Sequence, residues 1–560
     1  MRDLSVYTID FAIVIAYLAI IIGYGIYQGQ KVKTSSEFFI ADKRMPWWAC
    51  TIAFTTLVLS TQDIVSYSET GYIVGFTAFN PYISIGGFVF LFIALGAPIY
   101  YFTGVYTVPE YLSKRYNQGT SIAGSIALLL FLMAILAFNI YAFAVLIEGL
   151  VGFNVLTTIL VLSILIAIYT SIGGVVSVIT VDVLQAAFLI LGGLLVVFIG
   201  IDALGGVNEL VAWTPKENMM YTTKVNDPRY PAVGMWMGIS IIVAAFYMMH
   251  QGVLQKCLAA RSMNGTRLTM LIYGLFLLPM GCLFTGTPGL IARALVEKGV
   301  ISAPDTSGHT LAYLLNSIVP HGALGIVIAG YMAAMISTTD SYINSTVTVF
   351  VNDIYQKIVK NKPDKHYLTL ARVLTYVVAI GVPFVFVAYF MKIPYLMAAF
   401  YSITSAVVPG VLIAVIMGMG TKFFKAKAAT AAIIAGMLGT FLSIFMPEIF
   451  LKPFCIGIEY TDPGAAWFQT VAGFVWGVAA AVVFSFLPEK QKSDIELFGL
   501  VRNHPRVSVA HNAYFYGLTK NLKGIDQLTD SDKEHFLELN GIKHNRLHRS
   551  IKKIEVIDRA

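Results

Sequence analysis

Charged residues are scarce in this sequence. They make up 12% of the 560 residues, whereas charged residues make up about 25% of an ordinary soluble protein. Hydrophobic residues make up 57% of the chain, and its mean hydropathy is +0.74. Such a chain could not cover its apolar surface with polar groups in water, so the composition excludes an ordinary soluble globular protein. It predicts an integral membrane protein.

Cysteine is also scarce, and the common catalytic motifs are absent. The sequence has only four cysteines, and none of them has a CxxC or other metal-ligand spacing. A disulfide framework and a zinc site are therefore not expected, and we interpret the three cysteines in or beside apolar segments as packing residues. The sequence contains no glycine-rich phosphate loop, no HExxH motif and no serine nucleophile elbow. These absences predict a protein that is not an enzyme.

The sequence instead contains long apolar segments. A helix needs about 20 mostly apolar residues to cross the hydrocarbon core of a bilayer, which is about 30 Å thick. About thirteen predicted spans have this character: residues 8–27, 47–68, 79–104, 120–149, 153–171, 179–202, 232–255, 268–293, 322–350, 367–391, 393–419, 428–446 and 467–487. The first segment has no strongly basic region before it and no cleavage site after it, so we expect a span and not a signal peptide.

Lysine and arginine in the short loops predict the orientation of these spans. Positive residues resist translocation, so the loops that carry them stay in the cytoplasm. Clusters occur at residues 31–44, 114–115, 256–267, 357–365 and 422–427. With thirteen spans they all fall on one side, which places the N-terminus outside and the tail after Pro488 inside. We predict a multi-pass plasma-membrane protein whose net charge of +7 reflects topology and not a nucleic-acid partner.

The spans divide the chain into two five-helix groups with flanking parts. Residues 46–202 begin inside and residues 232–419 begin outside, which an inverted repeat would require. The other parts are an extra N-terminal helix with its cytoplasmic loop, an extracellular loop, two additional helices and a cytoplasmic tail, at residues 1–45, 203–231, 420–487 and 488–560. Residues 529–541 of the tail are typical of a capped amphipathic helix. We interpret the tail as a solvated segment in preference to a sensory or metal-binding module.

The stretch MISTTDSYINST, residues 335–346, places hydroxyl groups and a carboxylate inside an apolar segment. On a helix, Ser337, Thr338 and Ser341 share one face, and Asp340 lies at its edge. Such hydroxyl groups often bond back to the helix or join neighbouring helices. Here they lie beside an intramembrane carboxylate, and such carboxylates mark ion or substrate pathways. The stretch therefore predicts a cation site, with helix packing as the alternative.

Five motifs in chain order resemble the sodium/solute symporter family, which includes bacterial sodium/galactose, sodium/proline and sodium/sialic acid carriers. They are FFIADKRMPWW (38–48), YTVPEYLSKRYN (106–117), YTSIGGVVSVITVDVLQ (169–185), QKCLAARS (255–262) and STTDSYINSTVTVFVNDIY (337–355). The resemblance implies an all-α, leucine-transporter-like fold of five plus five inverted helices, with one extra helix before them and two after. It also implies secondary active transport by alternating access, in which Na+ is the coupling ion for symport of a small polar organic solute.

The resemblance further implies a principal sodium site. Its ligands would be the carbonyl oxygens of Thr56, Leu59 and Ala334 and the hydroxyl groups of Ser337 and Thr338. Hard cations prefer oxygen ligands, and helix carbonyls become available only where a helix is broken. Residues 53–72 contain no glycine or proline before Gly71 that would mark such a break.

A second cation site is expected one turn further along the same face. Its candidate ligands are Asp182, Asp340, Ser337 and Ser341. Two nearby carboxylates cannot both stay ionised without a cation or a proton between them. For Asp182 an interfacial cap or a salt bridge to an inner-loop lysine is an equal alternative.

The resemblance places the solute cavity beside the first helix of the first repeat. Its expected residues are Ser60, Gln62, Asp63, Tyr82 and Phe246 or Tyr247. The galactose carrier holds Gln, Glu and Asn at the positions of Asp63, Tyr82 and Val243, and residues 120–149 lack the arginine expected for sialic acid recognition. We expect Asp63 to favour a neutral polyhydroxyl compound or an amine over a simple anion, because a carboxylate accepts hydrogen bonds from hydroxyl and ammonium groups.

Two other functions remain as alternatives at this point. One is proton-coupled transport or facilitation without sodium, with Asp63, Asp182 or Asp340 as the proton carrier. The other is a membrane sensor that signals through its tail, which the shortness of the tail disfavours. In each case the expected partners are a small polar solute and the lipid bilayer, and the expected state is a monomer.

Overall fold

The computed structural model describes residues 7–29, 45–493, 496–497 and 500–501, apart from residues 106, 221, 394 and 406. The lysines predicted in loop 31–44 and the helix predicted at residues 529–541 lie outside these residues. Within the described residues every regular element is a helix, and an isolated β-bridge joins Met45 to Ala260.

The helices of the first half of the chain include several that are divided by short breaks or by single π-helical turns. They are α1 (Thr8–Gly29), α3 (Trp47–Val58), α4 (Thr61–Val74), η3 (Gly75–Phe79), α5 (Asn80–Leu91), the π-turn η4 (Phe92–Gly96), α6 (Ala97–Thr103), α7 (Val108–Arg115), α8 (Gln118–Val151), α9 (Val155–Leu204), α10 (Val207–Trp213), η5 (Lys216–Met219), α11 (Ala232–Met249) and α12 (Gln251–Leu258).

The second half is built in the same way. Its helices are α13 (Met263–Ile272), the π-turn η6 (Tyr273–Leu277), α14 (Leu278–Glu297), η7 (Ser307–His309), α15 (Thr310–Ile318), α16 (Ala323–Val349), the π-turn η8 (Phe350–Tyr355), α17 (Gln356–Ile358), α18 (Asp364–Phe390), α19 (Leu396–Ser405), α20 (Val408–Gly420), α21 (Ala426–Phe445), α22 (Pro447–Phe450), η9 (Lys452–Phe454), η10 (Pro463–Ala465) and α23 (Ala466–Ser485).

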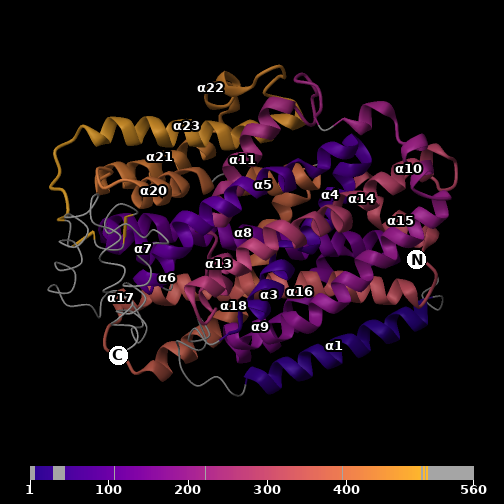
Figure 1. The fold of residues 1–560 in the computed structure, drawn as a ribbon, viewed down its shortest axis with the longest axis horizontal. Coiled ribbons are helices and arrows are strands. Elements are labelled where there is room, and N and C mark those ends of the chain that lie inside the picture. The colour runs from indigo at the N-terminus through magenta and orange to yellow at the C-terminus, as the bar shows by residue number, and fades with distance from the viewer. Residues whose placement is uncertain are drawn as a thin grey trace, which may run out of the picture.

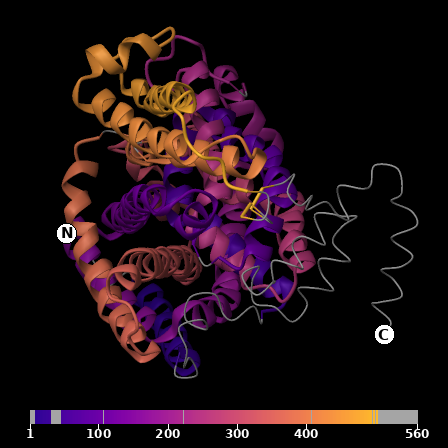
Figure 2. The same ribbon diagram turned by 90° about the vertical axis from the view of Figure 1, so that its left-hand side faces the viewer.

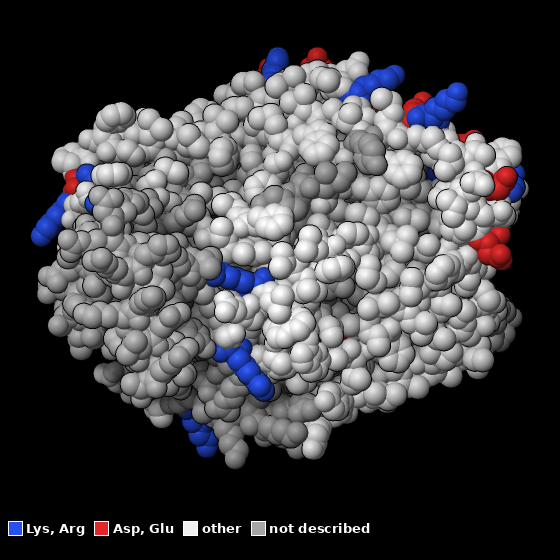
Figure 3. Space-filling view, viewed as in Figure 1, with Lys and Arg blue, Asp and Glu red and all other residues white. Residues whose placement is uncertain are grey.

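The long helices pack side by side around α16 (Figures 1 and 2). Every residue of α16 from Val327 to Val349 is buried, and the helix packs against α8, α9, α1, α3 and α18. Outer helices expose large apolar side chains, such as Ile15 on α1 at 65% and Val385 on α18 at 74%. In Figure 3 few charged side chains lie on the described face between the two ends of the bundle. This pattern fits a bundle whose sides face lipid and whose ends face water.

The N-terminal end of α1 and the C-terminal end of α23 lie at opposite ends of the bundle. Near the first, the Tyr7 hydroxyl donates to Asn316 Oδ1, 3.2 Å away, beside α15. Near the second, the Tyr111 hydroxyl on α7 donates to the carbonyl of Leu500, 3.0 Å away. Because these two helix ends lie at opposite ends of the bundle, the chain between them would cross the membrane an odd number of times.

Eight helices in the described residues are long and apolar enough to cross a bilayer. Two bent helix pairs pass the same test together, and three further apolar helices are shorter, at residues 88–101, 155–168 and 408–420. The expectation of a multi-span helical protein therefore holds, and the count of thirteen stays a prediction.

Several predicted spans differ from the helices observed. The spans predicted at residues 153–171 and 179–202 belong to one continuous helix, α9, because the intervening residues hold no proline or charge that would end it. The span predicted at residues 232–255 is broken at His250, whose imidazole Nδ1 accepts from the first amides of α12. The span predicted at residues 393–419 is divided between α19 and α20, where Pro409 lies in the first turn of α20.

Candidate functional site

The first helix of the predicted first repeat is broken at mid-length. Helix α3 ends at Val58, α4 begins at Thr61, and the two axes differ by 49°. Ser60 has an extended backbone, and its hydroxyl accepts from the amide of Asp63, 3.3 Å away. The Ser60 hydroxyl also donates to Asp63 Oδ2 at 2.6 Å. The sequence signal for this break was therefore the N-capping pattern S-x-x-D, and not a glycine or proline.

The break frees backbone oxygens opposite the polar face of α16. The Thr338 hydroxyl lies 3.3 Å from the carbonyl of Thr56 and 3.4 Å from that of Leu57. The Ser337 hydroxyl lies 2.9 Å from the Thr56 hydroxyl. Ala334 and Leu59 are buried nearby on α16 and at the break. This arrangement brings together hydroxyl and carbonyl oxygens of the type that a hard monovalent cation takes as ligands.

Lys256 forms a buried ion pair with Asp182 next to this oxygen cluster. Lys256 Nζ donates to Asp182 Oδ2 and to the carbonyl of Ala53, each at 2.8 Å, and both charged side chains are buried. The other carboxylate oxygen of Asp182 accepts from the Ser337 hydroxyl at 2.5 Å. A salt bridge to a lysine, one of the alternatives for Asp182, is therefore observed, but Lys256 lies on helix α12 and not in a loop. The pair joins α9, α12 and α3.

Asp340 is fully buried on α16. The Ser341 hydroxyl lies 3.2 Å from Asp340 Oδ1 and donates to the carbonyl of Ser337 at 2.7 Å. Through Ser337 these contacts lead on to Asp182. The four candidate residues of the second cation site therefore belong to one chain of oxygen contacts, in which an ammonium group already contacts Asp182.

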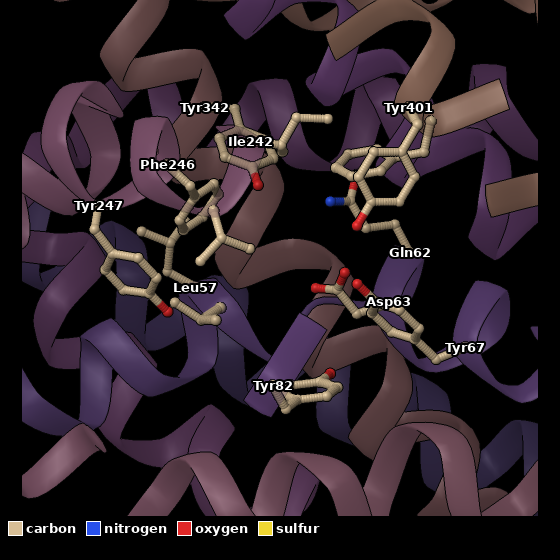
Figure 4. Close-up of a pocket in the computed structure, with 13 residues that line it drawn as sticks. Leu57, Gln62, Asp63, Tyr67, Tyr82, Ile242, Phe246, Tyr247, Tyr342 and Tyr401 are labelled. Carbon is tan, nitrogen blue, oxygen red and sulfur yellow. The ribbon is translucent and has the colours of Figure 1, made fainter. Parts of the chain in front are cut away.

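A cavity of about 60 Å³ lies beside the break, between α4, α5, α11, α16 and α19. Five of the six predicted solute residues line it, namely Gln62, Asp63, Tyr82, Phe246 and Tyr247. The sixth, Ser60, contacts the carboxylate of Asp63. In Figure 4 that carboxylate points into the space between the labelled aromatic side chains.

The sequence reasoning missed much of the cavity wall. Its remaining residues are Leu57, Val58, Tyr67, Ile242, Val243, Tyr342, Phe400 and Tyr401. Val243 had been noted only as a departure from the sugar carriers. Tyr342 follows Ser341 on α16, so the helix turn takes it to a different face from the polar stripe. Phe400 and Tyr401 belong to α19, and no local pattern indicated that this short helix would reach the cavity.

Asn139 on α8 was also missed. Its side-chain oxygen accepts from the amide of Gln62 at 3.3 Å. Its side-chain amide donates to the carbonyl of Met335 at 3.0 Å and to the Thr339 hydroxyl at 2.8 Å. Asn139 thus ties the first turn of α4 to α16. A single buried amide in an apolar helix was the available signal.

Glu69 is a further buried carboxylate that the sequence reasoning did not consider. It lies on α4, six residues beyond Asp63, and is fully buried. Its Oε1 accepts from the Ser307 hydroxyl of η7 at 2.5 Å, and its Oε2 accepts from the amide of Leu396, the first residue of α19, at 2.8 Å. A carboxylate at a helix N-terminus is favoured by the helix dipole. Glu69 therefore joins two of the helices that line the cavity.

We expect Glu69→Gln to lower the free energy of unfolding by about 1–3 kcal/mol, because the amide NH₂ would face a buried donor that it cannot satisfy. Thermal unfolding of the purified protein would measure the loss. Glu148→Gln is the control, since the side chain of Glu148 is 42% exposed. Equal melting temperatures for Glu69→Gln and wild type would show that the two hydrogen bonds contribute no stability.

Comparison with known proteins shows which family this chain matches. A family model described as the sodium:solute symporter family matches residues 38–439. A sodium/glucose cotransporter of Vibrio parahaemolyticus is 26% identical over 481 residues, covering 81% of this chain and 88% of the relative. The human sodium/myo-inositol cotransporter is 27% identical over 429 residues, covering 68% of this chain and 58% of the relative.

A solved structure has the same fold. It is described as the substrate-bound outward-open state of a Na+-coupled sialic acid symporter, and it aligns with a TM-score of 0.72 at 20% identity, covering 86% of this chain and 99% of the other. The family model covers most of the chain, and all five motifs on which the resemblance rests lie within the matched residues. The resemblance is confirmed: this chain belongs to the sodium:solute symporter family.

Proposed function

We propose that the protein is a sodium-coupled symporter, in which sodium moving down its gradient drives uptake of a small polar organic solute. The observation that carries this proposal is the broken helix α3–α4, which places freed carbonyls beside the Ser337 and Thr338 hydroxyls and places Asp63 in the neighbouring cavity. An ion and a solute bound on opposite sides of one break would each stabilise the same backbone arrangement, and this shared arrangement is the basis for coupling.

The breaks in the helices support alternating access by two inverted repeats. The first span of the predicted repeat 46–202 is broken at residues 59–60. The first span of the predicted repeat 232–419 is broken at His250. Both broken helices contribute to the cavity, through Asp63 and Phe246. Discontinuous helices at equivalent positions of two repeats mark the binding site in transporters of this type.

We further propose that the α1 end of the bundle at Thr8 faces the outside and that the α23 end faces the cytoplasm.

The proposed sodium ligands are the carbonyl oxygens of Thr56, Leu59 and Ala334 and the hydroxyl oxygens of Ser337 and Thr338. We expect Ser337→Ala and Thr338→Ala to raise the sodium concentration for half-maximal uptake, because each removes one ligand oxygen. Coupling energies of about 1–3 kcal/mol correspond to a change of about 5- to 150-fold. Solute affinity should weaken by the same linkage.

Solute uptake into proteoliposomes under imposed sodium or proton gradients would test the proposal. Thr346→Ala is a matched control, because Thr346 is another buried hydroxyl residue of α16 whose hydroxyl bonds back to the carbonyl of Tyr342 at 2.8 Å. Sodium dependence identical to wild type in both Ser337→Ala and Thr338→Ala would assign these hydroxyls to helix packing. Uptake driven by a proton gradient alone would replace sodium by protons as the coupling ion.

The cavity residues also limit the solute. Asp63 faces the cavity, so a simple monocarboxylate would be repelled, whereas hydroxyl or ammonium groups could donate to the carboxylate. The names of the relatives, cotransporters of glucose and myo-inositol, favour a neutral polyhydroxyl compound. The structure also permits an amine.

A further inference from the structure

The cavity beside Asp63 has an unbalanced charge. Asp63 is the only charged residue among the thirteen that line it, and none of the others is lysine, arginine or histidine. The ion pairs found among the described residues do not include Asp63. Its known partner is the neutral hydroxyl of Ser60, which donates to Oδ2. A carboxylate in an apolar surrounding is costly unless a cation accompanies it.

Gln62 adds a second hydrogen-bond acceptor to the same wall. Its side chain is 3% exposed and lines the cavity, and its amide oxygen has no hydrogen-bond partner among the described residues. Buried acceptors of this kind are normally satisfied. The side chains of residues 62 and 63 therefore both offer acceptor oxygens for a ligand that donates hydrogen bonds.

The rest of the wall is mainly aromatic. Seven of the thirteen lining residues are aromatic, namely Tyr67, Tyr82, Phe246, Tyr247, Tyr342, Phe400 and Tyr401. The Tyr247 hydroxyl donates to the Tyr273 hydroxyl, 3.0 Å away. These aromatic side chains form most of the cavity wall, and the labelled ones surround Asp63 in Figure 4. Aromatic rings attract organic cations, and cages of such rings recognise ammonium groups.

We propose that the solute is a small organic ammonium ion, held by the carboxylate of Asp63 and by the surrounding rings. This inference rests on the proposed transport function and names its substrate class. A sugar or polyol would leave the carboxylate without a counter-charge, because no lysine, arginine or histidine lines the cavity. An ammonium ion compensates the charge and needs no donors.

Matched pairs of ligands test this proposal on the purified full-length protein in sodium-containing buffer. Choline is compared with its neutral carbon analogue 3,3-dimethyl-1-butanol, and ethanolamine is compared with ethylene glycol. Glucose and myo-inositol are included as polyols. Binding is measured by isothermal titration calorimetry, and competition for uptake is measured in proteoliposomes. We expect an ammonium compound to bind more tightly than its neutral analogue and more tightly than either polyol.

Two substitutions test the residues. Asp63→Asn keeps the shape of the side chain and removes its charge, so it should weaken ammonium binding by at least about 30-fold, as expected when one member of a buried charge pair is neutralised. Phe246→Leu keeps an apolar side chain and removes a ring, so it should weaken ammonium binding by about 2- to 30-fold without affecting the neutral analogue. Gel filtration of both variants confirms that they are folded.

The outcomes separate this inference from the transport proposal. If no ammonium compound binds better than its neutral analogue, or if a polyol is bound and Asp63→Asn leaves that binding unchanged, the ammonium assignment is wrong. Sodium-driven uptake of a polyol would then leave the transport function standing. Ammonium binding without sodium-dependent accumulation would support the assignment of the cavity and contradict the coupling.

Discussion

Lys256→Met is expected to lower the free energy of unfolding by about 3–5 kcal/mol, which is the usual cost of removing one member of a buried ion pair. Lys256 contacts Asp182 Oδ2 and the Ala53 carbonyl at 2.8 Å, and its side chain is 3% exposed. Without it, the carboxylate of Asp182 keeps the Ser337 hydroxyl but loses its counter-charge. Thermal unfolding of the purified protein would measure this loss as a lower melting temperature.

The cause can be assigned with three control variants. Lys256→Arg keeps the charge and should stay closer to wild type than Lys256→Met. A double variant, Lys256→Met with Asp182→Asn, removes both charges and should recover part of the loss. Glu297→Gln breaks the exposed Arg293–Glu297 pair, whose atoms lie 2.7 Å apart, and should cost less than about 1 kcal/mol. If Lys256→Met melts like wild type, the pair contributes nothing to folding.

The ion pair also illustrates what sequence could and could not predict. The sequence places Asp182 at the start of an apolar segment, where a salt bridge to a lysine is one of the alternatives to a role in a cation site. Nothing in the sequence identified Lys256 as that lysine, because the two residues lie 74 positions apart and meet only through the packing of α9 on α12. Local patterns predict which residues are costly to bury, and the fold decides which of them meet.

The breaks in the helices had sequence signals of different strength. Pro409 and the S-x-x-D pattern at Ser60 are ordinary helix-start signals, and both sit at observed starts. His250 carries no such signal, since histidine is not a preferred N-cap, yet its ring accepts two amides there. Helix α9 shows the opposite case, because two separate spans were predicted where the backbone stays helical from Val155 to Leu204. Composition and periodicity thus predicted apolar helices well and their continuity poorly.

The cavity was predictable only where the resemblance supplied positions. Motif matches predicted five residues that do line the cavity, at positions 62, 63, 82, 246 and 247. The rings from α19 depend on how Glu69 and its partners place that short helix. An acid inside an apolar segment is a signal that sequence alone provides, so Glu69 could have been singled out together with Asp63, Asp182 and Asp340.

If Asp340 binds a second sodium ion, Asp340→Leu is expected to abolish solute uptake, whereas Asp340→Ser should preserve it. Asp340 is fully buried on α16, and Ser341 connects it to Ser337 and so to Asp182. We propose that a second cation binds among these oxygens. Lys256 already compensates Asp182, and this cation, either a sodium ion or a proton, would contact Asp340. Serine keeps an oxygen ligand, and leucine removes it.

The kinetics of uptake distinguish the two cations. If Asp340 contacts a second sodium, initial rates should rise with sodium concentration with a Hill coefficient above one. If it holds a proton, sodium kinetics should be those of a single site, uptake should depend on pH, and Asp340→Asn should remove that dependence, since an amide cannot titrate. Asp340→Leu must be recovered in the membrane at wild-type amounts for its loss of uptake to count. A Hill coefficient of one, uptake independent of pH and an active Asp340→Leu protein would together assign Asp340 to helix contacts, because a buried site that tolerates leucine cannot be binding a cation.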